Sequence, residues 1–333
     1  MDLSGKRILF IAPTFCGYER LIEAELEAHG ATVDYFSDRP GGDFLTKSLI
    51  RIDRRLLAAR TNRYYDRIIE SARAHRYDHI LIVRGEAISL ARLRKLREAQ
   101  PAARLSLYLW DSMHYNPNAR LIWREFDRVF SFDRSDADAN PRIAFLPLFY
   151  GREFERAAAD NGPREYDACF IGTIHTDRYK VLEKVVGALE ARGRKVFVFC
   201  YYPSKTLYRL RAALDPGFRR FARRYLSFTG MKLPEVVDHI ARSRAVIDIN
   251  RPSQLGLTMR TVEAAGAQRR LITTNEDIVN YDLYSPEGVL VVDRQDPAID
   301  DAFLDRETVP FDETVRRRYS IGSWLETIFG GNA

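Results

Sequence analysis

Three residues near position 260 have the types and the spacing to hold a nucleoside diphosphate. Thr258 opens a predicted helix, Arg260 lies in its first turn, and Glu263 follows one turn later. A helix N-terminus presents unpaired backbone N–H groups and partial positive charge, which suit a diphosphate. An arginine there adds a charge-assisted clamp, and a carboxylate one turn on can accept hydrogen bonds from ribose hydroxyls. We expect this helix to be the centre of a nucleotide site.

The segments around this helix must place its first turn at the edge of a sheet. The run 225–275 predicts a strand, a glycine turn, a helix, a strand, a polar loop, the Thr258 helix and a strand. In open α/β sheets, ligands bind beyond the C-terminal ends of the strands, which is where this polar loop and helix begin. The three predicted strands cover 225–229, 245–249 and 270–274.

Strands and helices also alternate through the rest of the chain, which predicts an α/β protein with parallel, doubly wound sheets. The 333 residues suffice for two domains. A polar stretch after Pro147 marks a hinge, so we expect a first domain at 1–150, a second at 151–320 and a C-terminal helix within 321–333. Further strands are predicted at 6–13, 31–37, 79–84, 104–110, 128–132, 167–171 and 195–200.

This pattern resembles the donor domain of glycosyltransferases of the GT-B fold. The matching residues are Thr229, Gly230, Arg260, Glu263, Ala264, 245–250 and 271–274. Within that group the chain is similar to the CgeB-like, lipopolysaccharide- or exopolysaccharide-biosynthesis type of bacteria, through the segments 108–115, 126–137, 145–150, 166–178 and 271–284. The resemblance implies two Rossmann-like domains facing a cleft, with the C-terminal helix packing back on the first domain. It also implies metal-independent transfer of a sugar from a nucleotide-activated donor to a bacterial surface-polysaccharide or lipid-linked glycan acceptor.

The resemblance also implies roles for individual residues on the donor side. The base would lie against Gly230 and Met231, and the phosphates against Ser253, Gln254 and Thr258. Such enzymes neutralise the leaving phosphate with cations and helix dipoles. The candidate donor-side groups are Arg260, Arg251 and Arg178, with Gly172 and Thr173 allowing close backbone approach, and Lys205 as a second-rank phosphate contact.

Two positions depart from the pattern of that family. Leu255 stands where many retaining members carry a second glutamate, eight residues before Glu263. Gln268 replaces the glycine usually found five residues after the glutamate. The stereochemistry of transfer and the residues that contact the sugar therefore stay open.

Inverting transfer needs a base that deprotonates the acceptor hydroxyl, and the first domain offers four candidates at strand ends. Asp111 is the first, because it ends a hydrophobic strand and lies beside His114, which could orient it or act itself. Capping of the next helix is an equally weighted role for Asp111. Glu86 follows the third strand and is second, and Glu19 follows the first strand and is third, although helix N-termini favour glutamate in any case.

Metal and cofactor sites are not indicated. Asp136 and Asp138 form a DxD sequence, but it lies at a predicted helix start and not at a hairpin tip. The histidines lack metal-ligand spacing. We expect no metal and no cofactor other than the nucleotide-sugar substrate.

Composition and charge describe a protein of the cytoplasm with two basic helical runs. The net charge is +6, and arginines cluster between 51 and 67 and between 209 and 224. Such helices could lie on anionic lipid at the inner face of the membrane or form a solvated helix face. Nucleic-acid binding is not indicated, because acidic residues are spread throughout the chain and the sequence contains no DNA- or RNA-recognition motif. No membrane-spanning run or signal peptide is predicted, and the three cysteines form no CxxC pair.

Two other functions fit the same sequence. A nucleotide-sugar 2-epimerase has this two-domain architecture and would convert a donor with no acceptor present. A non-catalytic nucleotide- or glycan-binding protein would retain the fold without turnover. Donor sugar, nucleotide, acceptor, linkage and oligomeric state are not readable from the sequence.

Overall fold

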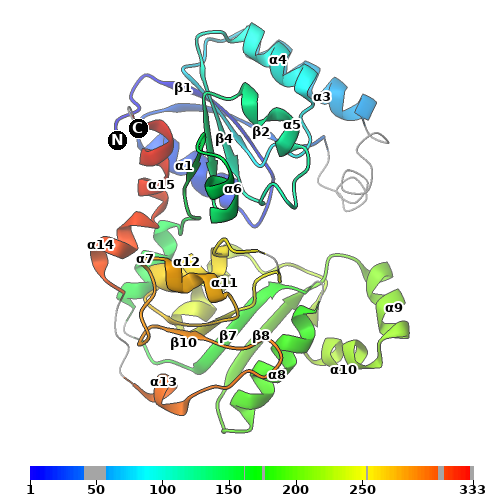
Figure 1. Cartoon of the computed structure of the whole chain (residues 1–333), viewed down its shortest axis with the longest axis vertical. Helices are drawn as coiled ribbons and strands as arrows, with labels where there is room; N and C mark the ends of the chain where they lie inside the picture. The colour runs from blue at the N-terminus through cyan, green and yellow to red at the C-terminus, as the bar shows by residue number, and fades with distance from the viewer. Residues whose placement is uncertain (41–57, 161, 175–176, 253, 307–310, 331–333) are drawn as a thin grey trace. The chain divides into compact units, whose positions relative to one another are not determined.

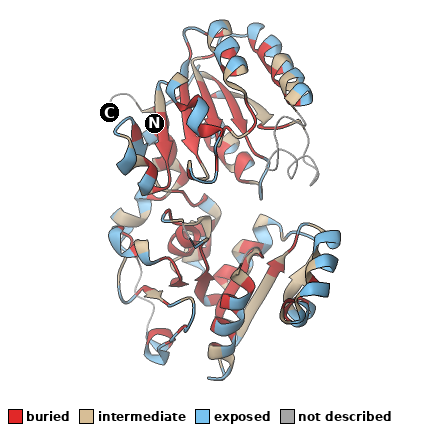
Figure 2. Ribbon diagram, turned by 45° about the vertical axis from the view of Figure 1, so that its right-hand side comes forward, coloured by how far each residue is buried: buried red, intermediate tan, exposed pale blue. Residues whose placement is uncertain are grey.

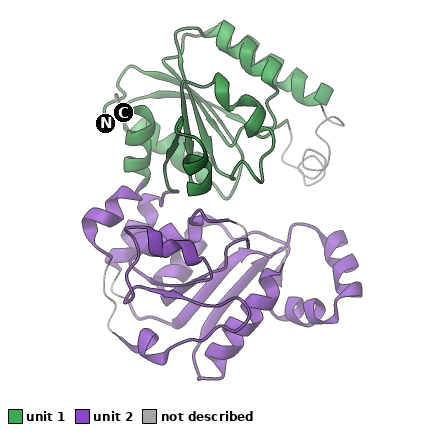
Figure 3. Cartoon of the chain, in the orientation of Figure 1, with its two compact units in different colours: residues 1–147, 321–333 green, residues 148–320 purple. Residues whose placement is uncertain are grey.

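The computed structural model describes residues 1–333 apart from 41–57, 161, 175–176, 253, 307–310 and 331–333. The chain divides into two compact units, one of residues 1–147 and 321–333 and one of residues 148–320 (Figure 3). Among the described residues, no helix combines the length and apolar character needed to cross a membrane.

The first unit is a six-stranded parallel sheet with the order β2-β1-β3-β4-β5-β6 (Figure 1). Its central strands are continuous apolar runs, as in β1, where residues 8–12 are all buried. Such runs are typical of parallel strands covered on both faces. The strands are β1 (Arg7–Ala12), β2 (Thr32–Ser37), β3 (His79–Val83), β4 (Arg104–Leu109), β5 (Arg128–Ser131) and β6 (Ile143–Phe145).

Helices cover both faces of this sheet, because successive side chains of a strand point to opposite sides. Leu9 and Ile11 of β1 belong to a core cluster with apolar residues of α3, α4 and α5. On the other face, Trp324 of α15 packs edge-on against Tyr108, with ring centroids 4.8 Å apart. The helices are α1 (Tyr18–Ala28), α3 (Ala58–Arg73), α4 (Leu90–Ala99), α5 (Ala119–Ile122), the 3-10 turn η2 (Trp123–Glu125), α6 (Arg134–Ala139) and α15 (Ile321–Phe329).

The second unit repeats this architecture with the order β12-β11-β10-β7-β8-β9, again all parallel. One face packs under α8 and α10, and the other meets α11, where His239 stacks on Phe197 of β8 at 3.7 Å. The central strands β10 and β11 are almost entirely buried, whereas β8 is mostly intermediate, and the helices are buried on their inner sides (Figure 2). The strands are β7 (Tyr166–Thr173), β8 (Val196–Tyr201), β9 (Leu226–Ser227), β10 (Ser243–Asp248), β11 (Arg270–Thr273) and β12 (Val289–Val291).

A buried arginine ties two helices of this unit together. Arg269 is 4% exposed, and its guanidinium donates to the carbonyl oxygens of Ala157, Ile240 and Ala241, at the C-terminal ends of α7 and α11. Helix C-termini carry partial negative charge and unpaired carbonyls, so they suit a cation. The helices are α7 (Arg152–Ala159), α8 (Arg178–Glu190), α9 (Lys205–Leu214), α10 (Pro216–Tyr225), α11 (Leu233–Ala241), α12 (Met259–Gly266), the 3-10 turn η3 (Glu276–Asn280), α13 (Asp301–Asp305) and α14 (Glu313–Arg318).

The predicted fold class is confirmed, since each unit is a parallel α/β sheet flanked by helices. Most predicted strands are found within one or two residues of their expected bounds. The strand expected at 225–229 shortens to Leu226–Ser227, because Tyr225 ends α10 and the Ser227 hydroxyl bonds to the backbone N and O of Thr229. Strands β6 and β12 have no counterpart among the predicted strand ranges.

Two helical glycines should respond in opposite ways to alanine. A Cβ on Gly266 would lie 2.5 Å from the buried Tyr150 ring, whereas one on Gly187 of α8 would meet nothing within 4 Å. We expect Gly266→Ala to lower the free energy of unfolding by about 1–3 kcal/mol through overpacking. Gly187→Ala should raise it by up to about 1 kcal/mol through helix propensity. Urea unfolding of both variants tests this, and equal effects would contradict the packing of α12 on Tyr150.

Candidate functional site

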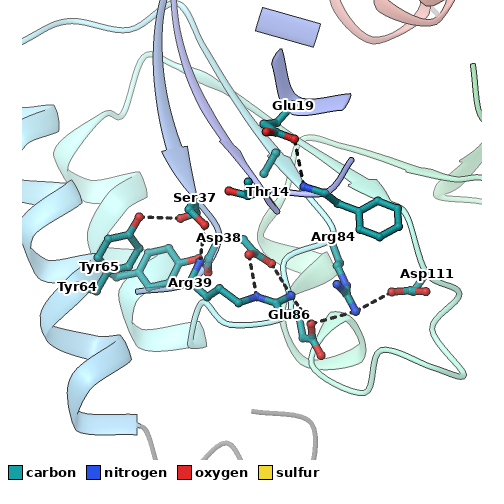
Figure 4. Close-up of polar contacts among 12 residues, drawn as sticks. Thr14, Glu19, Ser37, Asp38, Arg39, Tyr64, Tyr65, Arg84, Glu86 and Asp111 are labelled. Carbon is teal, nitrogen blue, oxygen red and sulfur yellow. Dashed lines mark hydrogen bonds and ion pairs between the residues drawn. The ribbon is translucent and has the colours of Figure 1, made fainter. Parts of the chain in front are cut away.

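In the first unit, residues that follow β2, β3 and β4 form one network of charged side chains (Figure 4). Arg39, after β2, bonds to Asp38 through Nε at 2.9 Å and to Glu86 through Nη2 at 2.7 Å. Arg84, after β3, lies 3.1 Å from Glu86 and 2.8 Å from Asp111, which follows β4. Carboxylates and guanidiniums thus alternate across the C-terminal edge of the sheet, where α/β proteins bind ligands.

This network is largely shielded from water. Asp38 is 0% exposed and Arg39 4% exposed. Burial opposes the charge of Arg39, but the neighbouring Asp38 and Glu86 carboxylates outweigh it, so the pKa of Arg39 is raised. With three carboxylates and two guanidiniums, the network carries one surplus negative charge when all are ionised. The positive and negative side chains of the network therefore nearly cancel one another.

Tyrosines and asparagines hold the backbone of the network in place. The hydroxyl groups of Tyr64 and Tyr65 donate to the carbonyl oxygens of Ser37 and Asp38, at 2.8 and 2.7 Å. Burial raises the pKa of Tyr64 to about 12, so this donor keeps its proton. Buried Asn116 donates to the carbonyl of Arg84 at 2.6 Å.

The turn at Arg84 is conformationally unusual. Arg84 has φ 72° and Gly85 has φ 63°, so two successive residues are left-handed. A non-glycine residue in this region is uncommon and is found where the surroundings fix it. Asn118 supplies that support by donating to the carbonyls of Gly85 and Ile88. The guanidinium of Arg84 is thereby aimed between two carboxylates.

The four predicted base candidates have different surroundings. The Asp111 side chain is 21% exposed and pairs with Arg84, whereas that of Glu86 is 13% exposed and contacts two arginines. Glu19 is buried in the first turn of α1, and its carboxylate accepts the backbone N–H of Phe15. His114 is exposed, and its ring packs edge-on against Tyr115.

The alternative capping role of Asp111 is not observed, because the N-cap of the following helix α5 is Asn118. Asp111 is instead the most exposed carboxylate of the network. It therefore stays the first candidate for a group that meets a substrate hydroxyl.

In the second unit, Arg260 and Glu263 of α12 form an ion pair, with Nη1 and Oε2 2.6 Å apart. Glu263 is 0% exposed, so it is a buried carboxylate and not a solvated surface residue. The first turn of the helix also differs from expectation. The Thr258 hydroxyl accepts the backbone N–H groups of Arg260 and Thr261, so these two donors are already satisfied by the cap.

Side-chain amides shape the loop between β10 and α12. Asn250 donates to the carbonyl of Gln254 at 3.1 Å, and Asn275 donates to that of Leu255 at 3.0 Å. Asp248, at the end of β10, accepts a 2.7 Å bond from the Thr261 hydroxyl of α12. The loop is thus anchored at both ends. Ser253 lies outside the described residues.

Three arginines gather beside this loop. Burial, joined by the charges of Arg251 and Arg294 and opposed by Asp248, lowers the pKa of Arg178 to about 10. Arg294 bonds to Asn250, to Thr274 at 2.9 Å and to Asp177 at 3.1 Å. A partly buried guanidinium whose pKa is lowered by burial and by like charges would gain from a nearby anion. We refer to Arg178, Arg251 and Arg294 as the arginine cluster.

The remaining donor-side candidates lie at loop positions of the same unit. Gly172 and Thr173 end β7, and Arg178 folds back to donate to the Thr173 carbonyl at 3.0 Å. Gly230 and Met231 lie between β9 and α11, and a Cβ on Gly230 would meet nothing within 4 Å. Lys205 is exposed at the start of α9, with its ammonium over the Phe228 ring.

The DxD sequence has a structural role at its first aspartate. Asp136 lies in α6 and accepts bonds from the backbone N of Met113 and the Ser131 hydroxyl, at 3.1 and 2.7 Å. Burial raises the pKa of Asp136. Among the described residues, no group of three His, Cys, Asp or Glu side chains could hold a metal ion.

Asp38, Arg39 and Arg294 are not among the site residues predicted from the sequence. All three follow a strand at its C-terminal end, so the rule that selected Asp111 also applies to them. Asp38 and Arg39 directly follow the strand predicted at 31–37, and Arg294 follows β12, which was not predicted. Reading each strand end, including those of edge strands, would have found them.

No protein-family model matches this sequence, and no curated protein matches it. Among solved structures, sucrose-phosphate synthase from Thermosynechococcus elongatus aligns over 97% of this chain and 98% of its own, with TM-score 0.62 and 14% identity. HepE from Anabaena, in complex with UDP and glucose, aligns over 97% and 98%, with TM-score 0.59 and 12% identity. A protein described as a UDP-N-acetylglucosamine 2-epimerase from Listeria monocytogenes aligns over 100% and 98%, with TM-score 0.55 and 12% identity.

These similarities establish the fold. The neighbours include GT-B glycosyltransferases, and the present chain has the same two Rossmann-like units. The predicted GT-B fold is therefore confirmed.

The Arg260–Glu263 pair generates a stability prediction. Removing one partner of a buried pair leaves an uncompensated charge, so Arg260→Ala should lower the free energy of unfolding by about 3 kcal/mol. Adding Glu263→Gln to that variant should recover part of the loss, because the buried charge is then removed. Urea unfolding of the two single variants and the double variant measures the coupling. Additive effects would show that the pair is not coupled.

Proposed function

We propose that this protein is a metal-independent glycosyltransferase of the CgeB-like type. It would move a sugar from a nucleotide-activated donor to a bacterial surface-polysaccharide or lipid-linked glycan acceptor. The GT-B fold and structural neighbours such as HepE, which was solved with UDP and glucose, support the nucleotide-sugar part of this proposal. In the described part of the chain, Cys16, Cys169 and Cys200 form no disulfide, which fits action in the reducing cytoplasm.

The arginine cluster is the observation that carries the proposal. It lies at the C-terminal edge of a parallel sheet, in the unit that corresponds to the donor domain by resemblance. Asp177 and Asp248 offset it only in part, and burial with like charges lowers the pKa of Arg178. A nucleoside diphosphate supplies the missing negative charge in the form that guanidinium groups bind best.

The ion pair on α12 suggests how the rest of the nucleotide is held. Glu263 is covered by Arg260 in the structure. For the Glu263 carboxylate to accept hydrogen bonds from ribose hydroxyls, Arg260 would have to turn away from it. The diphosphate would then take the place of Glu263 as the anionic partner of Arg260. Ribose and diphosphate would therefore engage together. The base would lie against the backbone at Gly230 and Met231.

The proposed reaction is direct displacement at the anomeric carbon. A carboxylate of the first unit, Asp111 before Glu86, accepts the proton of the acceptor hydroxyl as its oxygen attacks. The bond to the donor phosphate breaks, and the electron pair leaves with the nucleoside diphosphate. The arginine cluster, Arg260 and the α12 N-terminus stabilise the negative charge that develops there.

A 2-epimerase is the second candidate, because a neighbour of the same fold carries that description. Such an enzyme converts its donor without an acceptor, so incubation with the nucleotide sugar alone separates the two activities. A binding protein without catalysis would bind the nucleotide and neither transfer nor convert any donor.

The arginine cluster predicts selective stabilisation by a nucleotide. In a thermal-shift panel of UDP, GDP, ADP, dTDP, CDP and CMP, we expect one nucleotide to raise the melting temperature by about 2 °C or more. Arg178→Met should abolish that shift without destabilising the free protein, because it removes a desolvated cation. Arg244→Gln is the control, since Arg244 is exposed at the opposite end of β10. Loss of the shift in Arg244→Gln alone, or in neither variant, would contradict the assignment.

The proposed base predicts a catalytic loss without a binding loss. Asp111→Asn keeps the side-chain shape, so it should lower transfer by about 100- to 10,000-fold and leave the nucleotide shift unchanged. Transfer is measured with the donor of the nucleotide that the panel selects. Glu19→Gln tests the third candidate in the same way, and full activity is expected because that carboxylate accepts the backbone N–H of Phe15. Full activity of Asp111→Asn with loss in Glu86→Gln would move the role to Glu86.

A further inference from the structure

Helix α9 presents three leucines to solvent along one side. Leu207, Leu210 and Leu214 are 44%, 61% and 78% exposed. They are spaced three and four residues apart, so they form one stripe on the helix. Single exposed leucines are common, but an aligned group is characteristic of an interaction surface. We refer to these three residues as the α9 leucine face.

The attachment of α9 explains why this face stays outward. Tyr208 contacts the rings of Phe218 and Phe228, and Arg211 lies over the Phe218 ring at 4.4 Å. Ala212 is the buried residue of the helix. The side toward the unit is thus filled by these residues, and the leucines lie on the other side. Figure 1 shows α9 and α10 as a pair at one end of the second unit.

The same pair of helices carries a strong positive charge. Residues 205–225 contain seven Lys or Arg and one Asp, a net charge of +6, which equals that of the whole chain. The one acidic residue, Asp215, is engaged with the Tyr179 hydroxyl and the backbone N of Phe218. Arg219, Arg220 and Arg223 of α10 are exposed. In the part of the chain that the structure describes, none of these three forms a salt bridge.

Helix α3, which lies in the other arginine-rich segment of the sequence, buries its apolar side chains. On α3, Tyr65, Ile68 and Ile69 are buried in the core, and the exposed positions include Arg60 and Arg63. That helix is a solvated basic face over a normal core contact. Only α9 among these basic helices combines exposed leucines with a neighbouring arginine surface.

We propose that α9 and α10 dock this protein on an anionic lipid bilayer, with the α9 leucine face entering the headgroup boundary. The leucines supply the apolar contact, and the arginines bind lipid phosphates. An isolated polyanion such as a nucleic acid would satisfy the arginines but leave the leucines in water. The surface thus fits a membrane better than a soluble polyanion. This inference does not depend on sugar transfer.

The test is co-sedimentation of the full chain with vesicles of phosphatidylcholine alone and of equal parts of phosphatidylcholine and phosphatidylglycerol. We expect binding to the anionic vesicles, weakened by salt. Replacing all three leucines by glutamine should lower binding at least about tenfold. Arg220→Gln with Arg223→Gln should lower it roughly 25-fold, since each basic residue near an anionic surface contributes about fivefold.

Matched variants control for general effects of charge and polarity. Leu121→Gln removes a leucine that is 63% exposed in the first unit, and Arg60→Gln with Arg63→Gln removes two exposed arginines of α3. Both should bind vesicles as the unaltered protein does. All substituted side chains are exposed, so unchanged melting temperatures are expected and are checked for each variant.

Three outcomes would overturn the proposal. One is absence of binding to anionic vesicles. Another is unchanged binding of the triple leucine variant, which would reduce the contact to charge alone. The third is an equal loss in the α3 variant, which would remove the assignment to α9 and α10. Failure of the nucleotide panel would leave the vesicle result unaffected, so the two proposals are tested separately.

Discussion

The constraint on which both units depend is the burial of charge at the C-terminal edge of a parallel sheet. All strands of such a sheet end on one side, so polar residues far apart in sequence meet there. A charge taken out of water is costly unless a partner compensates it. The neighbours of Arg39, Arg84 and Arg260 are therefore as much a requirement of folding as a basis for chemistry.

The two edges meet this constraint differently. In the first unit, carboxylates and guanidiniums alternate, and the small surplus is negative. In the second, Arg260 is balanced by Glu263, whereas the three arginines of the cluster have the carboxylates of Asp177 and Asp248 beside them. An edge that is balanced internally suits a neutral hydroxyl substrate, whereas an edge with excess positive charge suits a phosphate. The asymmetry matches the proposed division between acceptor and donor.

The sequence predicted the sheets well because apolar runs such as 8–12 have one simple explanation in an α/β protein. It predicted the sites less well, because the type of a residue does not reveal which side chain it will pair with in the folded protein. Glu263 was identified, but its complete burial under Arg260 depends on how α12 packs. The Thr258 hydroxyl accepts the backbone N–H groups of Arg260 and Thr261. A Thr, Ser or Asp before a helix can make such a cap, but its presence in the sequence does not show whether the bonds form.

The basic helices show the same limit for surfaces. Leu207, Leu210 and Leu214 on α9 have the same three-and-four spacing as Tyr65, Ile68 and Ala72 on α3. A spacing of this kind is typical of a helix face that contacts a core. Which apolar stripe is buried depends on what fills the side facing the sheet. On α9 that side is taken by Tyr208, Arg211 and Ala212, so the leucines have no place in the core of their unit. Their exposure is therefore a property of the tertiary packing, and it is the exposure that makes α9 a candidate contact for lipid.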